Sequence, residues 1–301
     1  MELRQLKYFV KVAETLNFSE ASRTLFITQS TLSQQIKQLE QELDTQLLQR
    51  NSHNVALTEA GEAFLPCAVQ VLRNARQCVE KINDLKHLLT GTLNIGVTYT
   101  FSPILTETLS AFMKAYPEVT LNIFYKPMEE LMEMLHDREV DFVLAFKPSR
   151  PAEDVESHVL FQNFLAAVMS VDHPMASKEK ITLDELVNME LALPSHGLQA
   201  RSTFEELVPF NIHSKLKIRI QLNEVNILLK LIRQSNMVTV LAEGGVHNEP
   251  GIKAIPLDIP NNEMAGCVHV LKSAYRKRSM KEFIRMLSES VAVREQFNAW
   301  I

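Results

Sequence analysis

At 301 residues the chain is longer than one typical domain, and a hydrophobic content of 46% is enough for packed cores. No apolar run approaches the roughly eighteen residues that span a bilayer, and the N-terminus has no signal-peptide core, so we expect a cytoplasmic protein without membrane segments. The net charge of −5 excludes a strongly basic chain that binds nucleic acid by charge alone.

Cysteine usage and motif content exclude several chemistries. Cys67, Cys78 and Cys267 form neither a CxxC pair nor a Cys/His cluster at zinc spacing. We therefore expect neither a disulfide framework nor a structural metal site. The sequence also lacks GxSxG, HExxH, Walker and GxGxxG motifs, so it predicts no enzyme and no cofactor.

The first 43 residues predict three helices. Residues 2–16 place apolar side chains at helical spacing, and residues 18–43 predict two further helices at a tight corner. Ser19 is expected to cap the first helix of this corner and Thr28 the second. The expected apolar positions are Ala21, Leu25 and Phe26 on the first and Leu32, Ile36, Leu39 and Leu43 on the second.

The opposite face of the second corner helix carries side chains that can hydrogen-bond base edges and phosphates. They are Gln29, Ser30, Thr31, Ser33, Gln34 and Lys37. This content predicts a recognition helix that lies against DNA. Taken alone, the two helices would suit an ordinary hairpin with a solvated polar face better than a DNA-binding corner. Residues 1–58 carry six Lys/Arg and six Asp/Glu, a net charge of zero, so we expect modest affinity per subunit and effective binding by several subunits together.

Residues 47–58 predict a two-stranded wing. The turn residues Asn51, Ser52 and Asn54 lie between two short extended pieces. Arg50 and His53 are the expected phosphate-facing side chains of the wing, although His53 suits a solvated loop equally well.

Residues 59–89 predict one long helix, because apolar residues recur in steps of three and four at positions 60, 64, 67, 71, 75, 78, 82, 85 and 89. One helix cannot bury such a face, so we expect it to pair with a second copy of itself. Cys67 and Cys78 fall on this face, which gives them a structural role. Pro66 is expected to bend the helix near its start without breaking it.

Beyond residue 90, strand-like and helix-like segments alternate, which predicts a parallel sheet with helices on its faces. The first set has strands at 93–97, 119–125 and 140–146 and helices at 103–116 and 129–137. The second set has strands at 190–193, 216–222 and 237–241 and helices at 199–207 and 224–234. We therefore expect two α/β halves, with candidate crossovers between them at 157–171 and 265–273.

Ligands of open α/β sheets bind beyond the carboxyl ends of the strands, near helix N-termini. The candidate ligand-binding residues at these places are Thr98, Tyr99, Thr100, Phe101, Lys147, Ser195, His196, Arg201 and Gly244. Hydroxyls, amides and one or two cations suit a small anion such as a carboxylate, with Arg201 as its main charge partner. Two alternatives stay open: several of these residues merely cap helices, or Arg201 pairs with Glu205 one helical turn on.

The N-terminal residues also match a known spaced pattern. The matching positions are Phe18, Ala21, Leu25, Thr28, Gln29, Ser30, Leu32, Ser33, Ile36, Leu39, Glu40, Leu43, Leu47, Arg50, Leu57, Thr58, Ala60 and Gly61. On them the chain resembles the winged helix-turn-helix of the LysR-type transcriptional regulators. Ser22, Asp44, Leu48 and His53 depart from the pattern. Asp44 still suits a left-handed turn, whereas His53 weakens the case for minor-groove insertion by the wing.

The resemblance covers essentially the whole chain, strongly at 1–65 and only in layout beyond. It implies a winged helix-turn-helix DNA-binding domain at 1–58, a linker and dimerisation helix at 59–89 and a periplasmic-binding-protein-like α/β effector domain at 90–301. The effector domain would comprise one subdomain at about 90–161 and 269–301 and another at about 162–268. The implied protein is a homodimer or homotetramer that binds a palindromic operator on double-stranded DNA, responds to a small-molecule effector and contacts RNA polymerase.

A solute-binding protein and a redox sensor are two alternatives to an effector-responsive regulator. A solute-binding protein for transport is the nearer rival for residues 91–301, but it needs an export signal and leaves residues 1–58 unexplained. A redox sensor would need a reactive cysteine pair in the effector domain. Only Cys267 is present there, so an intramolecular disulfide switch is excluded on count alone. The twelve methionines are more simply core filler.

Overall fold

The computed structural model describes residues 1–50, 55–85, 89–148, 150, 152–246, 249–290 and 293. The chain divides into two compact units, Met1–His87 and Leu88–Ile301, each with its own buried core. Among the described residues, no helix combines the length and the apolar character that crossing a membrane requires.

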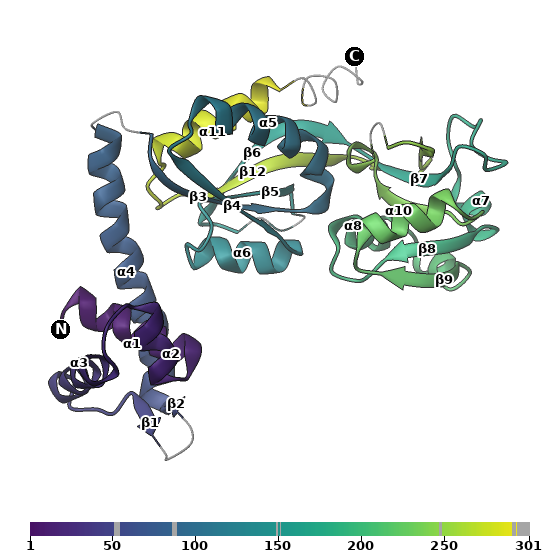
Figure 1. The fold of residues 1–301 in the computed structure, drawn as a ribbon. Coiled ribbons are helices and arrows are strands. Elements are labelled where there is room, and N and C mark those ends of the chain that lie inside the picture. The colour runs from purple at the N-terminus through teal and green to yellow at the C-terminus, as the bar shows by residue number, and fades with distance from the viewer. Residues whose placement is uncertain are drawn as a thin grey trace. The chain divides into compact units, whose positions relative to one another are not determined.

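The first unit consists of helices and one small hairpin (Figure 1). Its elements are α1 (Leu3–Thr15), α2 (Phe18–Thr24), α3 (Gln29–Glu42), β1 (Leu48–Arg50), β2 (Val55–Leu57) and α4 (Glu59–Leu85). β1 and β2 run antiparallel with Leu48 opposite Leu57, which confirms the predicted wing strands. The core that packs α1, α3 and the hairpin together includes Leu6, Phe9, Val12, Leu32, Ile36, Leu39 and Leu48.

The corner between α2 and α3 differs in three details from the prediction. Asn17, not Ser19, caps α2, because its side-chain oxygen accepts the backbone N–H groups of Ser19 and Glu20 at 2.9 and 3.1 Å. Phe26 is 94% exposed rather than buried, and its backbone lies in the left-handed region with φ 56°. Leu43 is 36% exposed where α3 ends, so the buried stripe is shorter than predicted.

Other features of this corner confirm the prediction. Thr28 caps α3, since its hydroxyl oxygen accepts the N–H of Thr31 at 3.2 Å. Asp44 follows α3 with φ 48°, the left-handed turn expected of it. The chain can therefore turn away from α3 into β1 without a glycine.

α4 is packed at its start and exposed farther along. Phe64 lies against Phe9 of α1, with ring centroids 5.5 Å apart. Beyond this contact, Val71, Val79 and Ile82 are 39, 61 and 53% exposed. An exposed apolar surface on an amphipathic helix is typical of a surface that packs against another element.

The bounds of α4 differ slightly from the predicted helix. It begins at Glu59 as predicted and runs through Pro66, but ends at Leu85. Residues 86–88 lie outside the described residues, and Leu89 is not helical. Cys67 and Cys78, placed on its apolar face by the sequence, are exposed.

The second unit has two lobes, the first built on a five-stranded sheet. Its elements are β3 (Gly91–Val97), η1 (Tyr99–Phe101), α5 (Ser102–Ala115), β4 (Val119–Tyr125), α6 (Met128–His136), β5 (Phe142–Phe146), β6 (Val155–Asn163), β12 (Met264–Leu271) and α11 (Arg278–Glu289). The strand order is β4-β3-β5-β12-β6. β3 is parallel to β4 and β5, whereas β12 is antiparallel to β5 and β6.

The second lobe repeats the α/β plan. Its elements are β7 (Leu165–Ser170), α7 (Leu183–Val187), β8 (Glu190–Pro194), α8 (Gln199–Leu207), α9 (Phe210–His213), β9 (Lys217–Leu222), α10 (Val225–Arg233), β10 (Thr239–Ala242), η2 (Glu243–Gly245) and β11 (Ile252–Pro256). β8 and β9 are parallel, and β7 pairs antiparallel with β10 and β11. A bridge between Leu191 and Val238 connects the two groups of strands.

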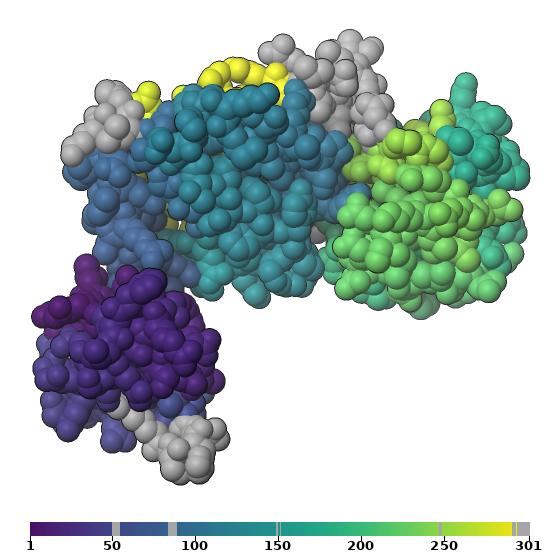
Figure 2. Space-filling view, in the orientation of Figure 1, coloured from purple at the N-terminus to yellow at the C-terminus, as the bar shows by residue number. Residues whose placement is uncertain are grey.

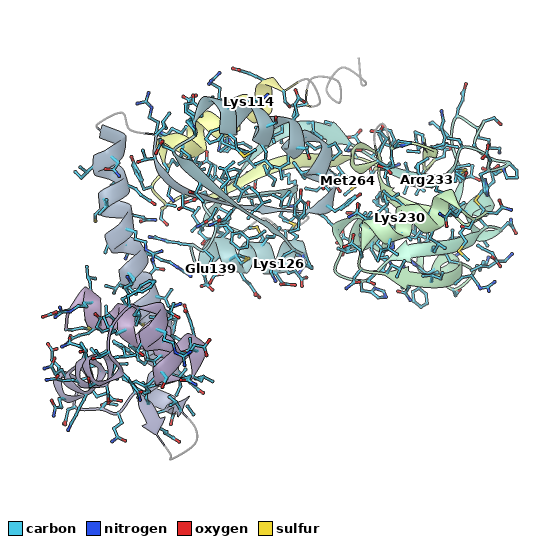
Figure 3. The ribbon with its side chains drawn as sticks, in the orientation of Figure 1. Lys114, Lys126, Glu139, Lys230, Arg233 and Met264 are labelled. Carbon is cyan, nitrogen blue, oxygen red and sulfur yellow. The ribbon has the colours of Figure 1, made fainter. Side chains whose placement is uncertain are left out.

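The predicted alternation of strands and helices is confirmed, with ends that differ by no more than two residues. The predicted crossovers are also confirmed: β6 leads directly into β7, and β12 returns the chain to the first sheet. Met264, labelled in Figure 3, begins β12 and is 4% exposed. The connection from β6 to β7 is therefore almost continuous strand, whereas residues 258–263, between β11 and β12, are not in a strand.

Gly61 allows α4 to lie close to the segment before the wing. A Cβ at this position would lie 2.1 Å from the carbonyl oxygen of Leu47 and 3.0 Å from Cδ2 of Leu57. Gly61→Ala is therefore expected to lower the free energy of unfolding by about 1–3 kcal/mol, measured by urea denaturation. Ala63→Ser, at an exposed position of the same helical turn, should change it by less than about 0.5 kcal/mol. Equal stability of Gly61→Ala and wild type would contradict this packing.

Candidate nucleic-acid interface and ligand cleft

α3 separates a buried face from a polar face. Leu32, Ile36 and Leu39 are fully buried. Of the predicted recognition side chains, Ser33 is half-buried and the others are exposed: Gln29, Ser30, Thr31, Gln34 and Lys37. The first turn of α3 carries no acidic residue, so the positive end of the helix dipole is not neutralised there.

Side chains tie the start of α3 to the start of α2. The Ser19 hydroxyl donates to Oε1 of Gln29 at 3.1 Å. The Thr28 hydroxyl lies 3.0 Å from that of Ser30 and 2.8 Å from that of Thr31. Ser19, predicted as a cap, therefore orients the Gln29 carboxamide at the beginning of the polar face.

Glu40 positions the wing. Its carboxylate accepts the backbone N–H groups of Leu47 and Leu48 at 2.9 and 3.1 Å, which fixes the start of β1 against α3. Hydrophobic periodicity does not indicate this contact. Arg50 ends β1, but its side chain and the whole of His53 lie outside the described residues.

In the second unit, the residues after β3 lie where the lobes touch. The N–H and the hydroxyl of Thr98 donate to the Leu144 carbonyl at 2.9 and 3.3 Å. The hydroxyl of Tyr99 donates to Asn226 of the other lobe at 3.3 Å. Burial, followed by the carboxylates of Glu249 and Glu224, raises the pKa of Tyr99 to about 12, so the phenol keeps its proton at neutral pH.

Thr100, Phe101 and Gly244 complete this junction. A Cβ at Gly245 would lie 3.2 Å from Cα of Thr100, so η1 and η2 are in close contact. Phe101 is fully buried, with ring centroids 5.2 Å from Phe161 and 5.9 Å from Phe146. Gly244 is buried and donates its N–H to Asn163. Phe101 therefore supports the wall of the junction from within the core.

A cavity of about 720 Å³ lies between the lobes. In the space-filling view the two lobes are distinct, one blue to teal and the other green (Figure 2). The first lobe contributes Met128, Glu129, Met132, His136, Phe146, Lys147, Pro148, Arg150, Ala152 and Gln162. The second lobe and the start of β12 contribute Gly197, Gln199, Ser202, Thr203, Glu206, Leu207, Asn261, Glu263, Met264 and Ala265.

Another cavity, of about 800 Å³, lies beside Phe164, Lys180 and residues 256–259 and 261–263, and none of the predicted ligand residues lines it. We assign the candidate site to the cavity between the lobes, because the end of β5 and the start of α8 meet there. Of the predicted ligand residues, Lys147 lines it.

Arg201 lies inside the second lobe. It is 5% exposed, and its Nε donates to Oε1 of Glu205 at 2.6 Å. His196 approaches the same oxygen at 3.2 Å, while the N–H of Ser195 donates to Leu222. The alternative pairing of Arg201 with Glu205 is therefore the one formed, with Arg201 buried and the Glu205 side chain 33% exposed.

Gln199 lines the cavity and was not among the predicted residues. As the first residue of α8, it reaches across to Phe146 and Met128 of the first lobe. A glutamine at a helix start has no distinctive sequence signal. The sequence indicates only its position, at the start of a helix that follows the loop at 195–198.

Comparison with known families agrees with this architecture. The family described as "Bacterial regulatory helix-turn-helix protein, lysR family" matches residues 3–62, and the "LysR substrate binding domain" matches residues 86–292. The chain therefore belongs to the LysR family, whose members are transcriptional regulators and not enzymes. This confirms the family and the fold class predicted from the sequence.

Individual relatives cover much of the chain. The uncharacterized HTH-type transcriptional regulator YwqM of Bacillus subtilis is 32% identical over 221 residues, 71% of this chain and 72% of that protein. The HTH-type transcriptional regulator BudR of Raoultella terrigena is 34% identical over 188 residues, 62% of this chain and 65% of BudR. The match to BudR thus spans less than two thirds of its length.

Solved structures share the fold. A full-length OxyR from Pseudomonas aeruginosa, in which one cysteine is replaced by aspartate, aligns with a TM-score of 0.71 at 24% identity, covering 98% of this chain and 95% of that one. CbnR in complex with its target DNA aligns with a TM-score of 0.68 at 21% identity, covering 96% of this chain and 99% of that one. At these identities the likeness concerns the fold alone.

The ion pair of Arg201 and Glu205 has a measurable pH signature. Burial opposes the charge of Glu205, but the hydrogen bond and the charge of Arg201, with a smaller effect of His196, lower the pKa of this carboxyl. Arg201→Leu should reduce the free energy of unfolding by about 1–3 kcal/mol near neutral pH. A lowered pKa contributes stability that is present above the unfolded-state pKa and lost as the pH falls through the folded-state pKa.

The difference in the free energy of unfolding between wild type and Arg201→Leu should therefore decrease on acidification. Urea denaturation of both proteins at about pH 7 and about pH 3.5 measures it. A deficit that stays constant between the two pH values would assign the effect to packing and not to the ion pair.

Proposed function

We propose that this chain is a transcriptional regulator that binds a palindromic operator through α3 and the wing and changes its DNA contacts when a small molecule fills the cleft of the second unit. The observation that carries the proposal is the division of α3 into a fully buried apolar face and an exposed polar face. A helix with this division presents hydrogen-bonding side chains to a major groove while its other side stays anchored in the core.

The DNA contacts are divided between specificity and affinity. Base edges and phosphates are assigned to Gln29, Ser30, Thr31, Ser33 and Gln34, and the phosphate backbone to Lys37, Arg50 and His53. Amide and hydroxyl groups suit base edges, whereas cations suit phosphates. Operator preference would thus arise from the first turns of α3.

The proposed division of labour follows the chain. Residues 1–58 read DNA, residues 59–89 join two copies, and residues 90–301 respond to the effector in two subdomains. The exposed Val71 and Ile82 support pairing, because a second copy of α4 would bury them. Two copies double the number of phosphate contacts, which compensates for a DNA-binding part without net charge. Homotetramers and contact with RNA polymerase belong to the same proposal.

The cavity between the lobes is the proposed effector site. Lys147 and Arg150 offer positive charge to an anionic effector, against the carboxylates of Glu129, Glu206 and Glu263. Since Arg201 is paired with Glu205, Lys147 is the better charge partner at the cavity itself. The contact between the lobes involves Thr98, Tyr99, Thr100 and Gly244. A movement of the lobes on ligand binding would change the contacts of these residues.

Redox sensing by Cys267 has no support in its surroundings. The side chain is fully buried in β12. Burial raises the pKa of the Cys267 thiol to about 11, although the charge of Lys147 acts in the opposite direction. The reactive thiolate is therefore disfavoured at neutral pH.

Substitutions on α3 should separate specificity from affinity. Gln34→Ala should relax base preference, at about 1–3 kcal/mol per lost bidentate contact. Lys37→Ala should weaken binding to all sequences alike and reduce the salt dependence by about one phosphate. Fluorescence anisotropy of the full chain with operator and scrambled duplexes measures both effects.

Gln41→Ala, at an exposed position near the C-terminal end of α3, is the matched control and should leave both properties unchanged. If the wild-type chain does not bind duplex DNA at low salt, the proposed function is wrong. Equal effects of Gln34→Ala and Gln41→Ala would remove the assignment of the polar face.

The apolar face of α4 should hold a dimer. Val71→Asp together with Ile82→Asp places carboxylates in the paired surface, where an unpaired charge is strongly disfavoured. The double variant should become monomeric in light scattering and lose operator affinity with the dimer. Arg76→Asp, at another exposed position of α4, is the control. Wild-type mass for the double variant would show that this face is not the interface.

A further inference from the structure

The last residue of β5, Phe146, is opposite Gly266 of β12 on one side, but no described strand pairs with it on its other side, the side of β3. β3 lies beside β5 as far as Val97, which is opposite Leu144. The chain then leaves the sheet: the N–H of Thr98 bonds to the Leu144 carbonyl, and η1 begins at Tyr99. Phe146 stands two residues beyond Leu144, so its N–H and C=O point to the same side as those of Leu144, where β3 has ended.

The side chain of Gln199 fills this position from the other lobe. Its Oε1 accepts the N–H of Phe146 at 2.9 Å, and its Nε2 donates to the Phe146 carbonyl at 2.8 Å. Nε2 also lies 3.0 Å from Sδ of Met128, at the start of α6. The carboxamide thus acts as one residue of a missing strand, with both of its polar atoms used.

We propose that the Gln199 carboxamide occupies part of the effector site when no effector is bound. It bonds to the N–H and the C=O of Phe146, and an amide-type group of the effector bonds to the same two groups when it binds. Gln199, Phe146 and Met128 all line the cavity between the lobes, so a ligand there meets this contact directly. The inference rests on the proposed function in one respect: it assumes that the effector enters this cavity.

The contact also restricts the chemistry of the group that can replace it. Phe146 offers a donor and an acceptor side by side, and a carboxamide matches both. A lactam or a cyclic imide does the same. A carboxylate only accepts, so it would leave the Phe146 carbonyl without a donor. One end of the effector is therefore an amide, lactam or imide, and any anionic charge lies at another part of the molecule, within reach of Lys147.

Chemical rescue tests this inference in the full chain. Gln199→Ala removes a group of the size and chemistry of acetamide, so free acetamide can take the vacated place. With the variant labelled on phenylalanine nitrogen, acetamide should bind at least about tenfold more tightly than to wild type and shift the Phe146 amide signal. Hydrogen exchange of the Phe146 amide should be about tenfold faster in the variant and slower again with acetamide.

Matched probes and variants decide the outcome. Acetate, which only accepts, and N,N-dimethylacetamide, which cannot donate, should not rescue. Gln162→Ala removes another glutamine that lines the cavity and should leave the Phe146 amide unchanged. Gln199→Glu keeps the shape and the acceptor but loses the donor, and acetamide should not bind more tightly to it than to wild type.

Rescue by acetate as strong as that by acetamide would overturn the amide requirement. A Phe146 amide unaffected in both Gln199 variants would overturn the contact itself. Both results are independent of DNA binding. Failure of wild type to bind duplex DNA would remove the proposed function and leave the exchange data at Phe146 as they are.

Discussion

The burial of Leu32, Ile36 and Leu39 against the core of the first unit is the constraint on which the DNA-binding geometry depends. These three side chains fix the rotation of α3 about its own axis, so the polar residues at its start can only face outwards. Glu40 then holds the wing to the same helix through two backbone N–H groups. Glu40 thereby fixes the start of the wing relative to α3.

In the second unit, the comparable constraint is the pairing of backbone groups where parallel strands end. Parallel strands end at one edge of the sheet, and the chain must leave that edge before every backbone group is paired. At the end of β5 this leaves Phe146 open towards the other lobe, and Gln199 occupies it. Gln199 thus pairs, from within the chain, the backbone groups that the end of β3 leaves without a strand.

Periodicity and spacing were sufficient to predict the elements and their order. The strand at 119–125 and the helix at 199–207 match β4 and α8 residue for residue. Side-chain contacts between distant elements could not be predicted in this way. Arg201 had a local alternative in Glu205, one turn along the same helix, and pairs with it, whereas Lys147 lines the cavity. Phe26 looked apolar and therefore internal, but the left-handed turn leaves it exposed.

The most direct test of the account is selection of duplexes from a random pool by the full-length chain. Symmetric pairs of subunits that read DNA through α3 should enrich sequences with two-fold related half-sites, spaced by about one helical turn of 10–10.5 base pairs or a multiple of it. Gln34→Ala should broaden the enriched half-site without changing the spacing. A pool that stays unenriched after repeated rounds, or that yields sequences without two-fold symmetry, would contradict the central claim.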